Sequence, residues 1–571
     1  MSMSRRDFLK IGGIGLAGMA IGGLNAPLFT PRSAFASGNA WRFGVMADTQ
    51  WRTGFNAGGE PASCAVSIIN ALNQQFIQHD VRFVIQVGDL VDKETADGTS
   101  AGPRSLPTRA SAAQALYDAG IGFFPVRGNH EGSKTAAAEI PFLFPQTLGL
   151  GSYVFGAQNF QSPVMPSTAT DPLGERLRGL TYSFDYENVR CVLIDQFTRA
   201  DGTSFNNSTN NNAVDQVDWV DAMLRSKPSD SHAFVFSHKN LIGQNHKDVL
   251  FGSSLTSNAA ARDQFIKSLC DSGVRLHMSG HDHMHHRSIV RTSDGLSSVG
   301  QLICSSNSYK FYIPRPGDDG RETPLQQELF TIGYYIVTVD GPRVYVDFYS
   351  SSHGSNYGDI DLITPPGTFP FHLRETFGYS LNGRQFEVAQ GAPYTIVEDR
   401  FEGTTAKILD GVNGNSETDY LSRLLTKTVN TGWTVRPAQD NIASNVLSLW
   451  GMADNLSLWD DPNRGLDLVG LMPDAAESKE SDVYTLAMTY EDERRNGLHL
   501  GNGGFRLAAK NADGAWVRAV DMNFGYFRKR FAKGPWRPGY ELGTYGVDTS
   551  TKTVWAVINF DGEFAAVRDL E

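Results

Sequence analysis

The sequence is poor in cysteine and contains no closely spaced cysteine pair. Its 571 residues include four cysteines, Cys64, Cys191, Cys270 and Cys304, and no two of them form a CxxC motif. This spacing excludes a zinc knuckle and a dense disulfide framework. Cys191, Cys270 and Cys304 lie in apolar or helical surroundings, which predicts that they are buried free thiols.

The sequence also lacks an excess of basic residues. It has 50 Lys and Arg against 62 Asp and Glu, which gives a formal net charge of −12. A general nucleic-acid or anionic-membrane binder needs a Lys- and Arg-rich surface, so neither is an expected partner. A small anionic substrate is still allowed, because a local site can be positive in an acidic protein. The hydrophobic content of 40% is ordinary for globular proteins, and the length predicts more than one domain.

Long apolar runs are missing outside the N-terminal segment. There, "SRRDFLK" (residues 4–10) resembles the twin-arginine export signal, a Gly-rich apolar stretch covers residues 11–24, and "AFA" (34–36) resembles a cleavage site. The alternative is a membrane-anchoring helix, but six glycines between Gly12 and Gly23 make the stretch weakly hydrophobic. We therefore expect residues 1–36 to be a cleaved signal, the mature protein to be periplasmic or secreted, and no stable membrane insertion to remain.

Residues 41–352 alternate between strand-like and helix-like segments. Examples are the apolar strand "VRFVIQVGD" (81–89), the amphipathic "NAVDQVDWVDAMLRSK" (212–227) and the strand "HAFVFSH" (232–238). Such alternation predicts a layered α/β domain, and the strands after residue 300 predict that part of the sheet system is mixed or antiparallel. Two long loops, 93–109 and 145–179, are expected to be binding loops or lids, or else disordered.

The composition changes after residue 352. A Pro- and Gly-rich linker is expected over 353–375, and an all-β, sandwich-like domain over 376–571, because short alternating segments follow one another with turn signals. The main helix signal in this region is "ETDYLSRLLTK" (417–427). Six of the nine tryptophans lie here, and we expect them in the core rather than in an exposed sugar-binding row.

Five segments place metal-ligand residue types directly after a predicted strand. Because the carboxyl ends of strands in α/β sheets are where sites assemble, the five together predict one shared site. The segments are "ADTQ" with Asp48 and Gln50, "VGDLVD" with Asp89, "RGNHE" with Asn129 and His130, "FSHKN" with His238, and "GHDHMHH" with His281 and His283.

In this order the segments resemble the calcineurin-like metallophosphoesterase superfamily, whose pattern is D-x-H, G-D-x-x-D, G-N-H-E/D, a lone His, and G-H-x-H. The resemblance covers roughly residues 41–352. It implies a four-layer αββα sandwich, two divalent metal ions (Mn, Fe or Zn) and hydrolysis of small phosphate mono- or diesters by a hydroxide that bridges the metals. It also implies two ligand sets that share Asp89: Asp48, Gln50, Asp89 and His283 for the first metal, and Asp89, Asn129, His238 and His281 for the second.

The histidine-rich segment fits two metals for a geometric reason as well. On an extended chain, residues i and i+2 point to the same side, so His281 and His283 can each reach one metal while Asp282 points away. His285 and His286 lie outside the pattern. We expect them to be exposed, and the alternative is that His285 supports a ligand or contacts substrate.

Gln50 departs from the pattern, because the family has His at this position. Both side chains are neutral, so the site charge is unchanged, but an amide oxygen is a harder ligand than an imidazole nitrogen. The first site is therefore predicted to be weaker, or to favour Mn or Mg over Zn.

His130 corresponds to a histidine that in the family assists the reaction without binding metal. The resemblance implies that it contacts the transferring phosphoryl group or protonates the leaving oxygen. Weaker candidates for substrate contact are Arg127, Lys239, Asn240, Asn307 and Tyr309, and each has a structural role as the alternative. A second hypothesis for the whole chain is an inactive binding protein on the same scaffold, acting through its C-terminal β-domain.

Overall fold

The computed structural model describes most of the chain. The described residues are 40–51, 63–92, 105–198, 211–315, 320–351, 369, 371–415, 417–439, 441–452, 482–491, 504–511 and 513–568. The predicted export segment, most of the loop at 93–109 and most of the predicted linker lie outside these ranges, so the expectations about them stay predictions. None of the helices in the described part is both long and apolar enough to cross a membrane.

Two mixed β-sheets form the centre of the first part of the chain. The first sheet has the strand order β14 (His372–Ser380), β13 (Arg343–Ser351), β12 (Ile332–Asp340), β1 (Trp41–Met46), β2 (Phe83–Val87), β3 (Gly122–Val126). The second has the order β11 (Glu322–Glu328), β9 (His285–Arg291), β10 (Ser298–Ile303), β8 (Leu276–Ser279), β7 (His232–Ser237), β6 (Val189–Ile194), β5 (Tyr182–Tyr186), β4 (Gln158–Gln161).

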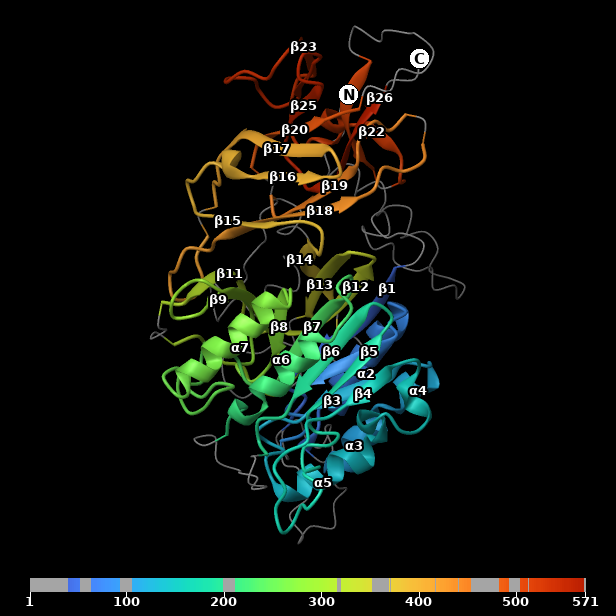
Figure 1. Cartoon of the computed structure of the whole chain (residues 1–571), viewed down its shortest axis with the longest axis vertical. Coiled ribbons are helices and arrows are strands. Elements are labelled where there is room, and N and C mark those ends of the chain that lie inside the picture. The colour runs from blue at the N-terminus through green and yellow to red at the C-terminus, as the bar shows by residue number, and fades with distance from the viewer. Residues whose placement is uncertain are drawn as a thin grey trace.

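Helices cover the outer face of each sheet (Figure 1). One apolar cluster joins the first sheet to α2 (Val66–Gln78), α3 (Ser105–Ala112), α4 (Gln114–Asp118) and α5 (Lys134–Leu143). Another joins the second sheet to α6 (Val217–Arg225) and α7 (Ala259–Asp271). A third cluster, which includes Phe43, Phe83 and Phe234, fills the space between the sheets. The result is the predicted αββα sandwich.

The strand directions bring the predicted ligand segments to one end of the sandwich. β1, β2 and β3 are parallel neighbours in the first sheet, and β7 and β8 are parallel neighbours in the second. The fully buried run Phe83–Val87 is typical of such a strand, since both of its faces are covered. The carboxyl ends of β1, β2 and β3 therefore lie side by side in the first sheet, and those of β7 and β8 lie side by side in the second.

The C-terminal part is a β-sandwich, as predicted (Figure 1, orange to red). Its sheets have the orders β15 (Gln385–Val388), β18 (Lys427–Thr434), β19 (Val446–Trp450), β26 (Gly562–Arg568), β21 (Phe505–Lys510), β22 (Trp516–Arg518), and β16 (Glu398–Phe401), β17 (Thr404–Gly411), β20 (Tyr484–Thr489), β25 (Thr553–Ile558), β24 (Thr544–Asp548), β23 (Arg530–Lys533). Short 3-10 helices are η3 (Pro145–Leu148), η4 (Ser152–Val154), η5 (Val214–Gln216), η6 (Tyr394–Ile396) and η8 (Ala519–Met522).

Some of the tryptophans of this sandwich are core residues and others are not. Trp433 and Trp555 are fully buried, and Trp450 is buried with its ring edge-on to Tyr345 of the first part. Trp516 and Trp536 are half-buried, and Trp459 lies outside the described residues.

Three details differ from the sequence-based expectations. β14 (His372–Ser380) pairs with β13, so these residues extend the first sheet instead of forming the end of a linker and the start of the β-domain. Residues 417–427 are not helical, because the Asp419 carboxylate accepts the backbone N–H groups of Leu421 and Arg423 and holds a turn. Cys270 is exposed on α7, whereas Cys64, Cys191 and Cys304 are buried free thiols.

Candidate metal centre

All seven predicted metal ligands gather where the five parallel strands end. Asp48 and Gln50 follow β1, Asp89 follows β2, Asn129 follows β3, His238 follows β7, and His281 and His283 follow β8. Two groups of side chains have ligand atoms within 4.8 Å of one another: Asp48, Asp89 and His283, and Asp89, His238 and His281. The first group, Asp48, Asp89 and His283, is the core of the ligand set predicted for the first metal. The second group, Asp89, His238 and His281, is the core of the set predicted for the second metal.

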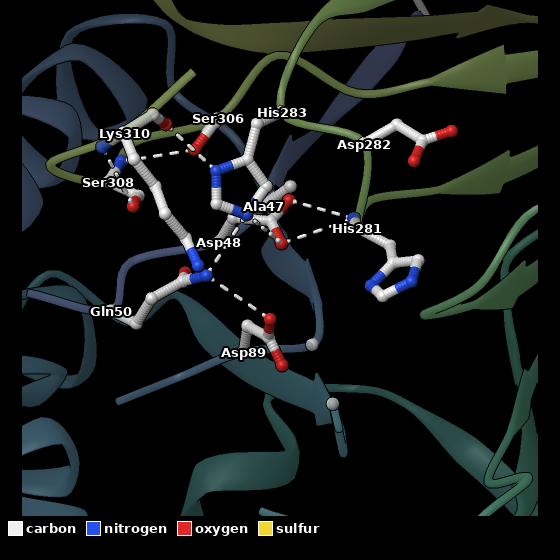
Figure 2. A network of polar contacts seen from close by, with 12 residues as sticks. Ala47, Asp48, Gln50, Asp89, His281, Asp282, His283, Ser306, Ser308 and Lys310 are labelled. Atoms are coloured by element: carbon white, nitrogen blue, oxygen red, sulfur yellow. Dashed lines mark hydrogen bonds and ion pairs between the residues drawn. The ribbon is translucent and has the colours of Figure 1, made fainter. Parts of the chain in front are cut away.

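Asp89 belongs to both groups, and its two oxygens face different ones. Oδ1 lies 3.3 Å from His238 Nε2, and Oδ2 lies 3.2 Å from the amide nitrogen of Gln50 (Figure 2). A carboxylate that spans two groups in this way is suited to bridge two cations, which need a shared anion between them at a separation of ~3.5–4 Å.

The polar atoms at the second group fit a bound cation. His238 Nδ1 lies 3.0 Å from the carbonyl oxygen of Val87, which can only accept, so this nitrogen carries the proton. His238 Nε2 lies 2.8 Å from Asn129 Oδ1 and 3.3 Å from the Asp89 carboxylate. The lone pair of His238 Nε2 thus faces two oxygen atoms, which repel it. A cation bound between these three atoms would be coordinated by them and would remove the repulsion. His281 Nε2 is buried and lies 3.5 Å from Asp248 Oδ2.

The histidines of the loop after β8 are held in the neutral form that metal ligands need. His283 Nδ1 donates to the carbonyl of Lys310 at 2.8 Å, which leaves Nε2 facing the first group. Burial and the nearby Lys310 ammonium lower the pKa of His283 well below its usual range. Burial, with a smaller contribution from His246, lowers the pKa of His281 to about 3.

The two buried carboxylates influence each other. Burial and the charge of Asp89 raise the pKa of Asp48 well above its usual range, although Asp48 accepts the backbone N–H of His281. Burial alone would also raise the pKa of Asp89, but His238 and His130 hold it well below its usual range. Divalent cations at this point would favour the ionised form of both acids.

Glycine precedes three of the ligands because the loops approach each other closely. A Cβ at Gly88 would lie 2.3 Å from the His238 ring, one at Gly128 would lie 2.0 Å from Asp89 Oδ1, and one at Gly280 would lie 2.5 Å from Asp48 Oδ2. The G-D, G-N and G-H pairs of the motif therefore leave room for a ligand from another loop.

The loop that carries His281 and His283 is not extended, which corrects the geometric reason given for their spacing. Their φ angles are 73° and 54°, and Asp48 and Asp89 also have positive φ. The two histidines reach different groups because of this left-handed turn, and Asp282 points away from both groups (Figure 2). Four non-glycine residues with positive φ in one cluster are typical of a functional site.

Gln50 lies at the first group, as predicted. Its Nε2 is 3.2 Å from Asp89 Oδ2 and 3.0 Å from His283 Nε2, while Oε1 has no hydrogen-bond partner among the described residues. Half a turn of the amide would place Oε1 where Nε2 now lies, so the side chain can present a ligand oxygen without moving its stem.

A Gln50→His variant is expected to shift the metal preference of the first site. The change replaces an amide oxygen with a softer imidazole nitrogen at unchanged formal charge, so affinity should move toward Zn relative to Mn or Mg. Metal titrations of the wild type and the variant, with activity measured in parallel, check this. Identical preferences in the two proteins would mean that Gln50 does not coordinate.

His130 lies beside the metal groups without joining either. Its Nδ1 donates to the carbonyl of Asp92 at 2.7 Å, and its Nε2 is 3.8 Å from Asp89 Oδ2. The side chain is 21% exposed and borders a pocket of about 180 Å³. The pocket is lined by Asp89, Asn129, His130, His246, Asp248, His281, His283, Lys310 and Tyr312. A substrate there would meet both His130 and the ligand groups.

The weaker substrate candidates have structural roles, and none of them lines this pocket. Arg127 is buried and pairs with Asp195 at 2.6 Å. Lys239 is buried and pairs with Asp248, and Asn240 donates to Asp282 at 2.8 Å. The remaining two are Asn307, whose amide donates to the carbonyls of Ala47 and Gly333, and Tyr309, whose hydroxyl lies 3.4 Å from Asp92.

His285 and His286 are fully buried, which contradicts the expectation that they are exposed. His285 lies 2.9 Å from Glu375 and stacks on Phe348, and His286 lies 3.0 Å from Glu322. Neither lines the pocket. Both belong to β9, and both are satisfied by carboxylates from later strands.

Several residues at the site were missed from the sequence. Lys310 and Tyr312 line the pocket in place of the predicted Asn307 and Tyr309, which are close to them in the chain. Glu131, the last residue of "GNHE", accepts the backbone N–H groups of Val91 (2.9 Å) and Gly128 (3.0 Å) and so joins two ligand loops. Its place in the motif was a signal that could have identified it.

The fold and the site together define a class. Two adjoining metal-ligand groups at the strand ends of an αββα sandwich are the arrangement expected of a metallophosphoesterase. Residues 42–285 match the family described as calcineurin-like phosphoesterase, which confirms the resemblance for this segment. No curated protein matches the sequence.

Some solved structures resemble parts of this chain at low similarity. Purple acid phosphatase PPD1 from yellow lupin (Lupinus luteus) seeds is 13% identical, with a TM-score of 0.36, over 61% of this chain and 54% of the lupin chain, about half of its length. A dimetal phosphatase from Danio rerio is 16% identical, with a TM-score of 0.32, over 54% of this chain and 95% of that one. GAP50, the anchor in the inner membrane complex of Plasmodium, is 14% identical, with a TM-score of 0.32, over 57% and 90%.

Proposed function

We propose that the chain is a metal-dependent phosphoesterase that hydrolyses small phosphate mono- or diesters at a two-metal centre. The observation that carries this proposal is the position of Asp89, with one oxygen toward each ligand group. The first cation would be held by Asp48, Gln50, Asp89 and His283, and the second by Asp89, Asn129, His238 and His281. Bound divalent cations would lower the pKa of a shared water and polarise the phosphoryl oxygens.

The charge of the site suits an anionic substrate. Two divalent cations against the two carboxylates Asp48 and Asp89 leave a net charge of about +2 in the ligand groups. The surrounding protein carries −12, so the pocket would be a local positive region in an acidic molecule. His130 borders the pocket, where its Nε2 can donate a proton to the leaving oxygen of the ester.

Lys310 adds a further positive charge at the pocket. Its side chain points toward the Gln50 amide and the first ligand group (Figure 2). Burial alone would lower the pKa of Lys310, but Tyr312, Tyr309 and Asp89 raise it above its usual value, so the ammonium stays charged. A charged donor beside the metal groups can bind a phosphoryl oxygen of the substrate.

A Lys310→Met variant is therefore expected to bind inorganic phosphate more weakly. A hydrogen bond to a charged group contributes about 1.5–3 kcal/mol, which corresponds to a roughly 10–100-fold rise in the inhibition constant. Lys310→Arg, which keeps the charge, should lose less. Unchanged phosphate inhibition in Lys310→Met, at unchanged metal content, would show that Lys310 does not contact the anion.

The activity itself is tested with the purified full-length chain. Metal-stripped protein and protein reloaded with Mn, Fe or Zn would be assayed on aryl phosphate mono- and diesters, nucleotides and phospholipid head groups. We expect turnover of at least one class that depends on added metal. No turnover of any of these substrates would instead favour the inactive binding protein that acts through the β-domain.

A further inference from the structure

A loop of the C-terminal β-sandwich lies on the first part of the chain. It comprises residues 417–426, between β17 and β18, and is called the docking loop below. The Tyr420 N–H donates to Gln327 at 2.8 Å, and the Thr426 N–H donates to the Pro324 carbonyl at 2.9 Å. The segment expected to be a helix is thus the contact that joins the two parts beside β11.

Arg423 is the docking-loop residue whose charged side chain contacts the first part of the chain. Its guanidinium donates to Glu322 at 2.9 Å and to the side-chain oxygen of Gln244 at 2.8 Å. Glu322 and Gln244 are buried, and the Gln244 amide also donates to Glu322, at 2.8 Å. Arg423, Gln244 and Glu322 therefore form a closed triangle across the boundary between the two parts.

Gln244 also connects this triangle to the loop that carries His281 and His283. The backbone N–H of Gln244 donates to Asp282 Oδ2 at 2.5 Å, and Asp282 lies between the predicted ligands His281 and His283. The Asp282 carboxylate is fully buried and also accepts from Asn240 and from both the backbone N–H and Nδ1 of His246. All of these donors belong to residues 240–246, so Asp282 connects the loop that carries His281 and His283 to that segment.

We infer that Arg423 of the β-sandwich is a positioning residue for the metal centre, acting through Gln244 and Asp282. His281 and His283 have positive φ angles, and such backbone persists only where the surroundings hold it. The docking loop supplies part of that support from outside the catalytic sandwich. This gives the C-terminal domain a role in metal binding, and it rests on the function proposed above.

An Arg423→Ala variant of the full-length chain is expected to bind metal more weakly. Partners that orient metal ligands typically contribute about 10–100-fold in affinity, and Arg423 acts through two further residues, Gln244 and Asp282, so we expect a loss at the lower end, about tenfold. The experiment titrates Mn²⁺ and Zn²⁺ separately into metal-stripped protein and measures the dissociation constants.

The chain offers a matched control at the opposite end of the first sheet. Arg343 pairs with Glu563 of the β-sandwich and donates to Ser448 at 3.1 Å. It begins β13, beside the amino end of β1, whereas Asp48 follows the carboxyl end of β1. Arg343→Ala should lower the melting temperature by weakening contact between the two parts, yet leave metal affinity at the wild-type value.

A second variant keeps the inference testable if Arg423→Ala does not fold. Gln244→Ala removes the middle of the triangle but leaves the pair between Arg423 and Glu322, and it should also weaken metal binding. Wild-type affinity in either folded variant, or an equal loss in Arg343→Ala, would overturn the inference while leaving the proposed function intact. A wild-type chain that binds no metal would overturn both.

Discussion

An Asp89→Asn variant is expected to lose both metals and, as a result, to lose activity by more than about 10²-fold. This loss is larger than the loss expected when a residue that only orients a metal ligand is removed. The physical reason is that Asp89 directs one oxygen to each ligand group. Asparagine keeps the shape of the side chain and tolerates the positive φ of 46° at this position, so the change tests charge and bridging and not the fold. Metal content per chain and turnover would both be measured.

Asp92→Asn is the matched control for this prediction. It makes the same substitution in the same motif, three residues further on, in a carboxylate that belongs to neither ligand group. Asp92→Asn should retain wild-type metal content. If Asp89→Asn also kept both metals, or lost as little as Asp92→Asn, the bridging role of Asp89 would be wrong.

His130→Ala is expected to keep its metals and to lose rate, by roughly 10²–10⁴-fold if His130 donates the proton to the leaving group. Metal content should survive because the contact between this position and Asp89 Oδ1, at 3.1 Å, is made by the backbone N–H, which alanine retains. The side chain itself contacts the Asp92 carbonyl and faces the pocket.

The leaving group distinguishes two roles for His130. An ester with a good leaving group needs no proton, so the loss of rate should be much smaller for it than for a poor one. An equal loss for both would indicate that His130 stabilises the phosphoryl oxygens instead. Loss of metal in His130→Ala would rule out a role independent of metal binding.

The αββα core and the place of the site could be predicted because both depend on short-range patterns. A buried strand followed by Asp89 or His238 marks a strand end, and parallel strand ends meet at one edge of a sheet. The spacing of His281 and His283 predicted that the two side chains reach different groups, and the structure places them so. The reason given was wrong, because the loop is a left-handed turn and not an extended segment.

What could not be predicted depends on partners distant in the sequence. His285 is buried because Glu375, on β14, reaches it, and His286 because Glu322, on β11, does. The docking loop has an apolar pattern typical of a helix, but Asp419 forms local hydrogen bonds with its backbone, and Arg423 and Tyr420 find partners in the first part of the chain. Lys310 and His246 line the pocket from segments that carry no motif.

The central claim is that Asp89 joins two metal sites, and metal stoichiometry tests it most directly. The full-length wild-type protein, saturated with Mn²⁺ or Zn²⁺ and freed of excess ion, would be analysed for bound metal per chain. We expect two divalent ions per wild-type chain, and fewer than one per chain in Asp89→Asn. A wild-type chain that holds no metal, or an Asp89→Asn chain that still holds two, would contradict it.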